Sequence, residues 1–186
     1  MRLLERLAGR IDLVNDRIGR GVAWLALIMV LAQFVIVVMR YVFGLGSVAM
    51  QESVVYMHAT VFLLASGYTL LHNAHVRCDI FYAGAPARRR AIIDLFGVLA
   101  FLIPTCVGVA WVAWPYVASS WAVWEGSSEG SLGLPAVFAL KTVILLFTAA
   151  VFLQGLSLGA RALLTLAGRR PRAGSGDAST VGPERD

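Results

Sequence analysis

The segment HNAHVRCD, residues 72–79, places three potential metal ligands at a spacing of three residues. They are His72, His75 and Cys78, and Asp79 could supply the fourth ligand that a closed zinc site requires. The segment directly follows a long apolar stretch, and polar side chains are expected where such a helix ends. We therefore interpret these residues as a polar helix end, and we expect neither a metal ion nor another cofactor.

The histidines and cysteines also lack a haem or redox pattern. A haem group between helices needs axial histidines from facing helices, whereas all three histidines lie within or just after residues 48–71. Cys78 and Cys106 do not form the Cys-x-x-Cys pair of thiol-oxidising enzymes. The apolar stretches contain no Ser/His/Asp or paired-carboxylate constellation, so the sequence indicates a protein that is not an enzyme.

Two opposite charges lie at the edges of the first two apolar stretches, where a lone charge is costly. Arg40 is six residues before Gly46, and Glu52 is six residues after it. A hairpin that turns at Gly46 would bring both side chains to about the same depth. The sequence therefore predicts an ion pair between Arg40 and Glu52.

Lys141 is a further charge, six residues into the last apolar stretch. It would lie about 9 Å below the start of that helix, at 1.5 Å per residue. Its long side chain could extend outward to water, or it could join a cluster with Glu52 or Glu129. We interpret these charges as a staple that fixes the helix order, or as a staple that also serves as a subunit contact. The alternative is a docking point or an ion-coupling site, and a sodium site would usually require interrupted helices.

The elements that must position these charges are four long apolar stretches, at about residues 21–43, 48–71, 92–117 and 135–164. Hydrophobic residues make up 59% of the 186-residue chain. Charged residues make up 15%, well below the roughly 25% that is typical of soluble domains. Because about 20 apolar residues cross a bilayer core as a helix, the sequence predicts an all-α integral membrane protein, a bundle of four spanning helices.

Arginine residues indicate the orientation of the predicted spans. They cluster before residue 21, between residues 77 and 90, and from residue 161 onward, whereas the two other connections contain no lysine or arginine. With four spans all three clusters lie on one side, which the positive-inside rule assigns to the cytoplasm. We therefore expect both termini in the cytoplasm and a multi-pass protein of the bacterial inner membrane. The net charge of +5 is then a topology signal, and we expect no nucleic-acid partner.

The two ends of the chain differ from the apolar stretches. Residues 1–20 have apolar side chains at a helical period and arginines on the other faces, and their charges continue too far for a signal peptide. We expect an amphipathic helix that lies on the membrane surface; the alternative is a solvated helix that leads into the bundle. The polar residues 167–186 are expected to form a disordered cytoplasmic tail.

Several short motifs resemble the small permease subunit, the DctQ type, of tripartite ATP-independent periplasmic (TRAP) transporters. The first apolar stretch ends in RYVF at residues 40–43, and Gln51 and Glu52 open the second. The segment HVRCD at residues 75–79 resembles the family's His-x-Arg-x-Asp pattern. The residues that match this pattern are His75, Arg77 and Asp79.

Motifs in the second half of the chain follow in the same order. The loop EGSSEGSLGLP at residues 125–135 contains Glu129 and leads to Lys141. It is followed by LQGLS at residues 153–157, and the resemblance covers about residues 10–166. These last motifs resemble members associated with keto acids, dicarboxylates and aromatic acids, which implies an organic acid as the transported substrate.

The resemblance implies two protein partners, a large multi-span permease subunit and a soluble periplasmic solute-binding protein. It also implies transport driven by a sodium gradient, with the substrate and sodium sites on the large subunit. The small subunit would act as a scaffold for the large one and help dock the binding protein. In this interpretation His75, Arg77 and Asp79 shape the cytoplasmic turn.

Two other functions remain open at this point. A small transporter or channel acting alone, or as a homo-oligomer, would need polar residues along one stripe of several helices, and the sequence contains few. A membrane redox subunit would need cofactor ligands on facing helices, which the histidine positions disfavour.

Overall fold

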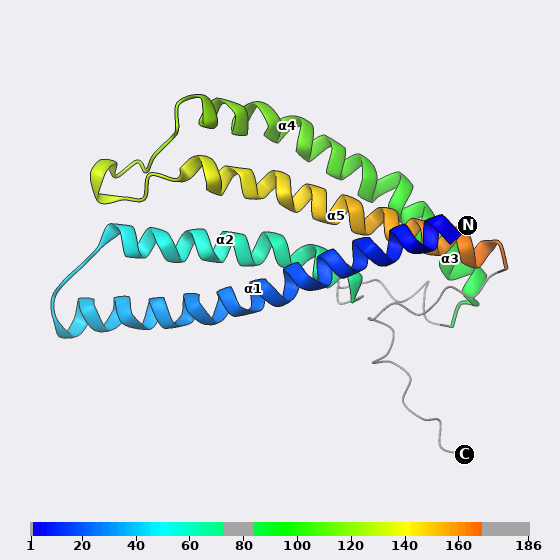
Figure 1. Cartoon of the computed structure of the whole chain (residues 1–186), viewed down its shortest axis with the longest axis horizontal. Helices are drawn as coiled ribbons and strands as arrows, with labels where there is room; N and C mark the ends of the chain where they lie inside the picture. Colours follow the sequence, from blue (N-terminus) through cyan, green and yellow to red (C-terminus); the bar gives the residue numbers. More distant parts are fainter. Residues whose placement is uncertain (1, 73–83, 169–186) are drawn as a thin grey trace, which may run out of the picture.

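The computed structural model describes residues 2–72 and 84–168, and the regular structure in these ranges is helical (Figure 1). The helices are α1 (Arg2–Val42), α2 (Val48–Leu71), α3 (Ala87–Gly97), α4 (Ile103–Ala122) and α5 (Val137–Leu166). A π-helical turn, Val98–Leu102, joins α3 to α4, so that residues 87–122 form one long helix. Four helical stretches are long and apolar enough to cross a membrane. The predicted all-α class with four spans is confirmed.

The connection between α1 and α2 shows how local sequence ends one helix and begins the next. Gly44 has φ +68°, in the left-handed region that favours glycine, and it follows the last turn of α1. Three residues later the Ser47 hydroxyl accepts a hydrogen bond from the Met50 N–H at 3.4 Å. This N-cap satisfies one of the free N–H groups at the start of α2, so a short connection is sufficient to reverse the chain.

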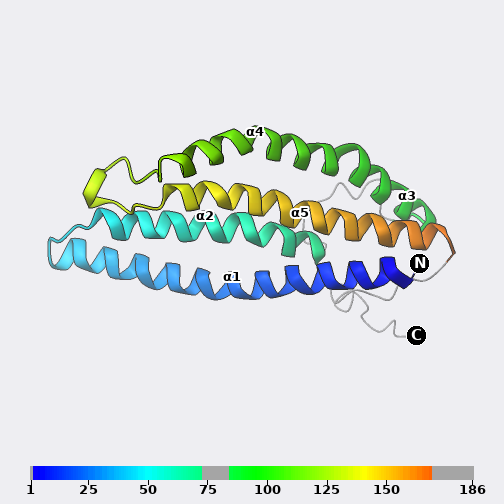
Figure 2. The same ribbon diagram turned by 45° about the horizontal axis from the view of Figure 1, so that its top comes forward.

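α5 is the central helix of the bundle. Figure 2 shows the long helices side by side in the order α1, α2, α5, α4. Among the described residues, α5 packs against α1, α2, α3 and α4. The structure buries nine residues of α5 but two of α2. The bundle therefore leaves broad faces of its outer helices, α1 and α4, open to their surroundings.

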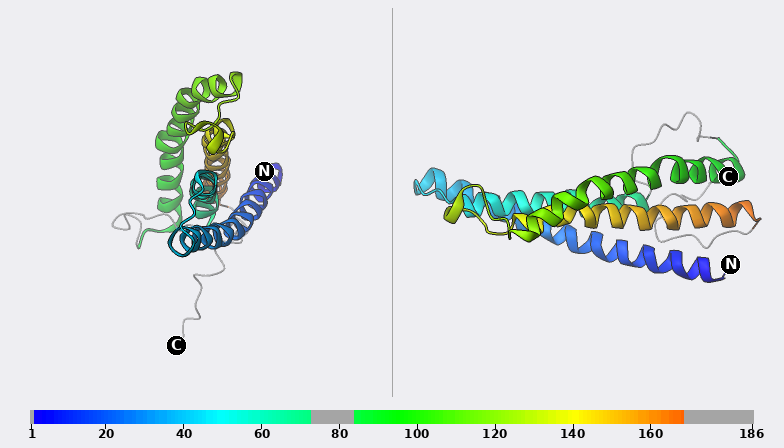
Figure 3. Two further views of the ribbon diagram at one scale, coloured as in Figure 1. Left: turned by 90° about the vertical axis from the view of Figure 1, so that its left-hand side faces the viewer. Right: turned by 90° about the horizontal axis from the view of Figure 1, so that it is seen from above.

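The described part of the chain begins and ends at the same end of the bundle (Figures 1 and 3). We call this the terminal end; the opposite end, with residues 43–47 and 123–136, is the loop end. An even number of spans requires this arrangement. Figure 3 also shows that α1 and α4 run obliquely to α5, and α1 meets α5 towards the terminal end.

The first helix differs from the sequence-based expectation. No break separates residues 1–20 from the first span, because α1 is continuous from Arg2 to Val42. Its early residues Ala8, Asp12 and Asn15 are buried, and Asp12 and Asn15 bond to α5. This geometry favours the alternative of a helix that leads into the bundle over a separate helix lying on the membrane.

Two helix boundaries near prolines also shift. The third predicted span, residues 92–117, lies within the longer helix 87–122. Pro104 removes one backbone N–H, and the preceding turn widens so that the Ile103 N–H donates to the Val98 carbonyl. Pro135, the expected first residue of the fourth span, instead lies just before Ala136, the N-cap of α5.

Candidate functional site

Glu52 connects the start of α2 to the long loop between α4 and α5. The Ser127 hydroxyl donates a hydrogen bond to Glu52 Oε1, and the Leu134 N–H donates to Oε2 at 2.6 Å. Gly133 makes this approach possible, because a Cβ there would lie 2.7 Å from Glu52 Oε2 and overlap the Ser127 side chain. One carboxylate therefore holds two points of the loop against α2.

Lys141 holds the same loop from the side of α5. Its ammonium group pairs with the Glu125 carboxylate and lies 4.0 Å from the centroid of the Tyr116 ring. The hydrogen bond from Lys141 keeps the pKa of the Glu125 carboxyl below its ordinary value. The sequence left open an extension of Lys141 to water or a cluster with Glu52 or Glu129, and the observed partner is Glu125. We call Glu52, Ser127, Glu125 and Lys141 the loop-end cluster.

The predicted ion pair between Arg40 and Glu52 is wrong for this structure. The hydrogen bonds of Glu52 go to Ser127 and Leu134, and the ion pairs found within the described ranges do not include Arg40. The physical reason is that α2 presents Glu52 to the loop after α4, whereas Arg40 and Gln51 are exposed on another side of the hairpin.

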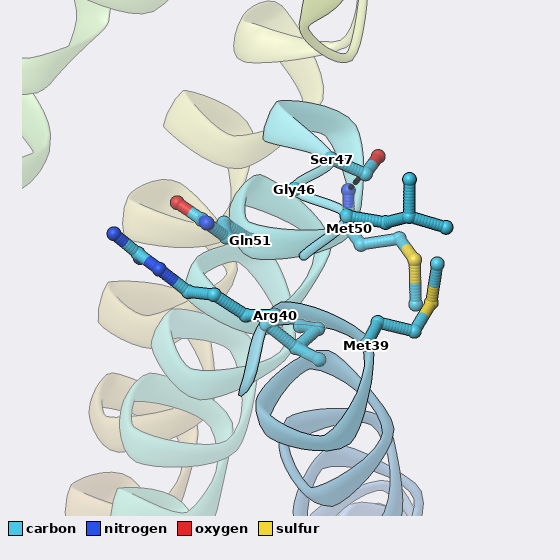
Figure 4. Close-up of a pocket in the computed structure, with 8 residues that line it drawn as sticks. Met39, Arg40, Gly46, Ser47, Met50 and Gln51 are labelled. Atoms are coloured by element: carbon cyan, nitrogen blue, oxygen red, sulfur yellow. Dashed lines mark hydrogen bonds between the residues drawn. The ribbon is translucent and has the colours of Figure 1, made fainter. Parts of the chain in front are cut away.

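Arg40 and Gln51 instead lie beside a small recess where α1 turns into α2. Figure 4 shows both side chains pointing to the same side, away from Met39 and Met50. The recess has a volume of about 10 Å³ and is also lined by Ile36. A volume of this size holds about one water molecule, so the recess is too small for an organic substrate.

Aromatic side chains close the loop end around the start of α5. The rings of Trp121, Trp124 and Phe138 pack edge to face, with centroids 4.7 to 5.5 Å apart. The Trp121 Nε1–H donates to the Thr142 hydroxyl at 2.9 Å. These contacts fix the end of α4 against α5, and they position the loop that Glu52 and Lys141 hold.

A second set of polar residues, which the sequence analysis missed, lies buried towards the terminal end. The Gln154 amide donates to Asp12 Oδ1 at 3.0 Å and accepts from the Asn15 amide at 2.7 Å. The Ser157 hydroxyl donates to Asp12 Oδ1 at 2.8 Å, and Arg161 forms an ion pair with Asp12. We call these five residues the buried polar network. They join α1 to α5 through hydrogen bonds and one ion pair.

The spacing of these residues contains a signal that could have revealed the network. Asp12 and Asn15 are three residues apart, and Gln154, Ser157 and Arg161 recur at three and four residues. Each set therefore falls on one face of its helix. The expectation for residues 1–20 rested on the apolar period and the arginines, so the acidic and amide residues there had no assigned role.

A smaller charged group links α1 to the end of α2. Arg20 pairs with Asp16 at 2.6 Å, and His72 Nε2 lies 3.7 Å from the Asp16 carboxylate. The Tyr68 ring packs on the His72 ring at 4.2 Å, and a Cβ at Gly19 would overlap the Tyr68 side chain. His72 thus contacts α1, which agrees with its interpretation as part of a polar helix end.

Several predicted residues remain without a described environment. His75, Cys78, Arg77 and Asp79 lie outside the described residues, as does the tail from residue 169. Glu129 is exposed; its backbone N–H donates to the Ser127 hydroxyl, and its backbone carbonyl accepts from the Leu132 N–H. Within the described ranges no group of three or more histidine, cysteine or acidic side chains could hold a metal ion.

The outer helices expose large apolar side chains over most of their length. On α1, Trp24 and Phe34 are 70% and 66% exposed; on α4, Trp111 and Val112 are 80% and 73% exposed. A soluble protein rarely exposes apolar patches of this extent. Lipid or another membrane protein must therefore cover these faces.

Comparison with known families agrees with this architecture. The family model described as "Tripartite ATP-independent periplasmic transporters, DctQ component" matches residues 27–165. No curated protein and no solved structure matched the chain. The match begins within α1 and ends within the last turn of α5, so it includes all four spanning helices. The chain therefore belongs to the DctQ family, the small membrane subunits of tripartite ATP-independent periplasmic transporters.

Proposed function

We propose that this subunit is a scaffold that braces a large permease subunit and helps dock a periplasmic solute-binding protein. One observation carries the proposal. The buried polar network joins α1 to α5 through bonds among its own side chains, while the apolar faces of α1 and α4 remain open. A self-sufficient transporter would instead need polar groups free to bind its substrate inside the bundle.

The orientation supports the docking part of this proposal. Except for Arg40, the arginines of the described residues lie towards the terminal end, on the first half of α1, the first turn of α3 and the last turns of α5. The loop after α4 instead carries Glu125 and Glu129. By the positive-inside rule the terminal end faces the cytoplasm of the bacterial inner membrane. The loop end then faces the periplasm, where a soluble binding protein would meet the loop-end cluster.

In this proposal the sites that bind the transported substrate lie on the partner proteins. The resemblance of the motifs between residues 125 and 157 implies an organic acid, and the family resemblance as a whole implies coupling to sodium. The large subunit would hold both sites, and this chain would set its position in the membrane. The subunit would have no catalytic activity of its own.

The test is co-purification followed by transport. The tagged chain is co-expressed with the large subunit, extracted in mild detergent, and analysed by mass spectrometry. We expect the large subunit in near-equal amount, and sodium-dependent uptake in vesicles only when both subunits and the binding protein are present. A chain that purifies alone or only with itself, or uptake that proceeds equally well without it, would contradict the proposal.

A further inference from the structure

One face of α2 exposes polar side chains at a depth where an isolated membrane helix meets hydrocarbon. The exposed residues of α2 are Gln51, Val55, His58 and Phe62, and the rest of this helix is buried or half-buried. Their spacing of four, three and four residues places them on a single face. His58 and Gln51 are therefore not turned towards the bundle.

α1 carries a matching row of exposed residues. Val30, Gln33, Val37 and Arg40 are exposed and are spaced by three, four and three residues. Arg40 and Gln51 line the same recess and point to the same side of the hairpin (Figure 4). Because α1 and α2 are antiparallel neighbours, a step of seven residues away from the turn brings Gln33 and His58 to a common depth.

This depth lies inside the apolar part of the hairpin. Seven residues correspond to about 10 Å along a helix, and residues 21–39 carry no charged side chain. In the described part of the chain, no hydrogen bond or ion pair engages the side chains of Gln33, Arg40 or His58. The His58 ring contacts the Phe62 ring, with centroids 6.5 Å apart. Polar groups in the hydrocarbon region face protein or a water-filled cavity, because an unpaired one is costly.

We propose that Gln33, Arg40, Gln51 and His58, the polar stripe, form the surface on which a membrane-spanning helix of the large permease subunit packs. The matching helix offers a carboxylate near the loop end, for Arg40 and Gln51. About two turns deeper it offers amide or hydroxyl groups for Gln33 and His58. The inference rests on the proposed scaffold function and deepens it by naming the surface.

Charge and depth favour this occupant over two others. A second copy of the chain, packed in the same orientation through the same face, would bring another Arg40 to the first. Its carboxylate at that depth, Glu52, is bound by Ser127 and Leu134 instead of facing the stripe. A lipid headgroup phosphate could reach Arg40, but Gln33 and His58 lie about 10 Å deeper, in the hydrocarbon. A protein helix with polar groups at both depths satisfies the whole stripe.

Site-specific photo-cross-linking tests the surface in the co-expressed complex. A photoreactive amino acid replaces Val37 or Val55, which lie between the members of the polar stripe on the same faces of α1 and α2. The control position is Val112, an exposed residue of α4. We expect the two stripe positions to cross-link to the large subunit. Cross-links from these positions only to lipid or to a second copy would overturn the inference, and so would large-subunit cross-links from Val112 alone. If the inference fails in one of these ways but the large subunit still co-purifies, the proposed scaffold function is not contradicted. If the large subunit is absent from the wild-type preparation, both the scaffold function and this inference are overturned.

Apolar substitutions provide a second measurement. Gln33→Leu and His58→Leu should each lower the amount of co-purified large subunit roughly threefold, the effect of losing one hydrogen bond within a membrane. Thr105→Val, at an exposed position of α4, removes a polar group elsewhere and should leave the amount unchanged. Retention of the large subunit by both stripe variants at the wild-type level would overturn the inference. The helicity of each purified variant, expected to match the wild type, separates lost binding from misfolding.

Discussion

The buried polar network and the loop-end cluster use similar side chains for different structural tasks. In the network, the Asp12 side chain is 7% exposed and its partners come from the rigid helix α5. In the cluster, the Glu125 side chain is 38% exposed and its partner Lys141 holds a loop. Burial makes the first set strongly coupled to the stability of the bundle. The second set is half-buried and holds a loop, so it acts as a local restraint on that loop.

The two regions also differ in whether a partner protein could contact their side chains. A binding protein that docks at the loop end would meet carboxylates, a lysine and a loop held by hydrogen bonds. No comparable access exists to Asp12, Asn15 or Gln154, which are buried between α1 and α5. We therefore expect variants of the network to affect folding, and variants of the cluster to affect the loop and its contacts.

The largest effect is expected from Asp12→Ala. The substitution leaves the partly buried Arg161 guanidinium without its carboxylate, and breaking a buried pair from one side costs about 3 kcal/mol. Thermal unfolding in detergent measures the loss. Arg17→Ala, an exposed arginine on the same helix, is the control and should change the unfolding temperature little. An Asp12→Ala protein as stable as the Arg17→Ala protein would show that the network does not hold α1 to α5.

The next effect concerns the close approach of α1 and α2 beside the network. Gly19→Ala would place a methyl group against the Tyr68 side chain, and overpacking of this kind costs about 1 to 3 kcal/mol. Gly21→Ala has free space around the new methyl group and should stabilise the helix by about 0.5 to 1 kcal/mol. Detergent unfolding of the two variants should therefore shift in opposite directions. Shifts in the same direction would contradict the tight contact.

The sequence predicted the helices well because apolar length alone defines a membrane span. The same reasoning failed for contacts that depend on helix rotation. Arg40 and Glu52 have equal distances from the turn, but α2 turns Glu52 towards Ser127 and Leu134. Hairpin symmetry gives depth, not the side to which a residue points. For Lys141 the sequence left open an extension to water or a cluster with Glu52 or Glu129, and the loop conformation selects Glu125 instead.

The network was missed for a related physical reason. Asp12 and Arg161 are separated by most of the chain, and their pairing depends on α1 continuing straight beyond the span. An expected boundary near residue 20 had removed that possibility. The polar stripe became visible only with burial, since spacing alone does not distinguish an outward-facing Gln33 from one facing α5.

A moderate, local effect is expected from Glu52→Ala. Loss of the carboxylate removes the hydrogen bonds to the Ser127 hydroxyl and the Leu134 N–H. The Leu134 amide should exchange with deuterium on the order of ten times faster, as charge-assisted bonds contribute more than neutral ones. Glu129→Gln changes an exposed carboxylate in the same loop and is the matched control. Equal exchange in both variants would mean that Glu52 does not restrain the loop.

The smallest effect is a change in acid titration at the loop end. The Lys141 hydrogen bond lowers the pKa of the Glu125 carboxyl from its ordinary value of 4.5. The pair therefore stabilises the loop at neutral pH, and this contribution is lost only as the pH falls through the lowered pKa. Carbon NMR of labelled glutamate in micelles, assigned with Glu125→Gln, should show the Glu125 pKa rising in Lys141→Met. An unchanged Glu125 titration would show that Lys141 does not hold the loop in solution. In that case Glu52 alone would restrain the loop end, and the buried polar network would be the one organised polar region of the two.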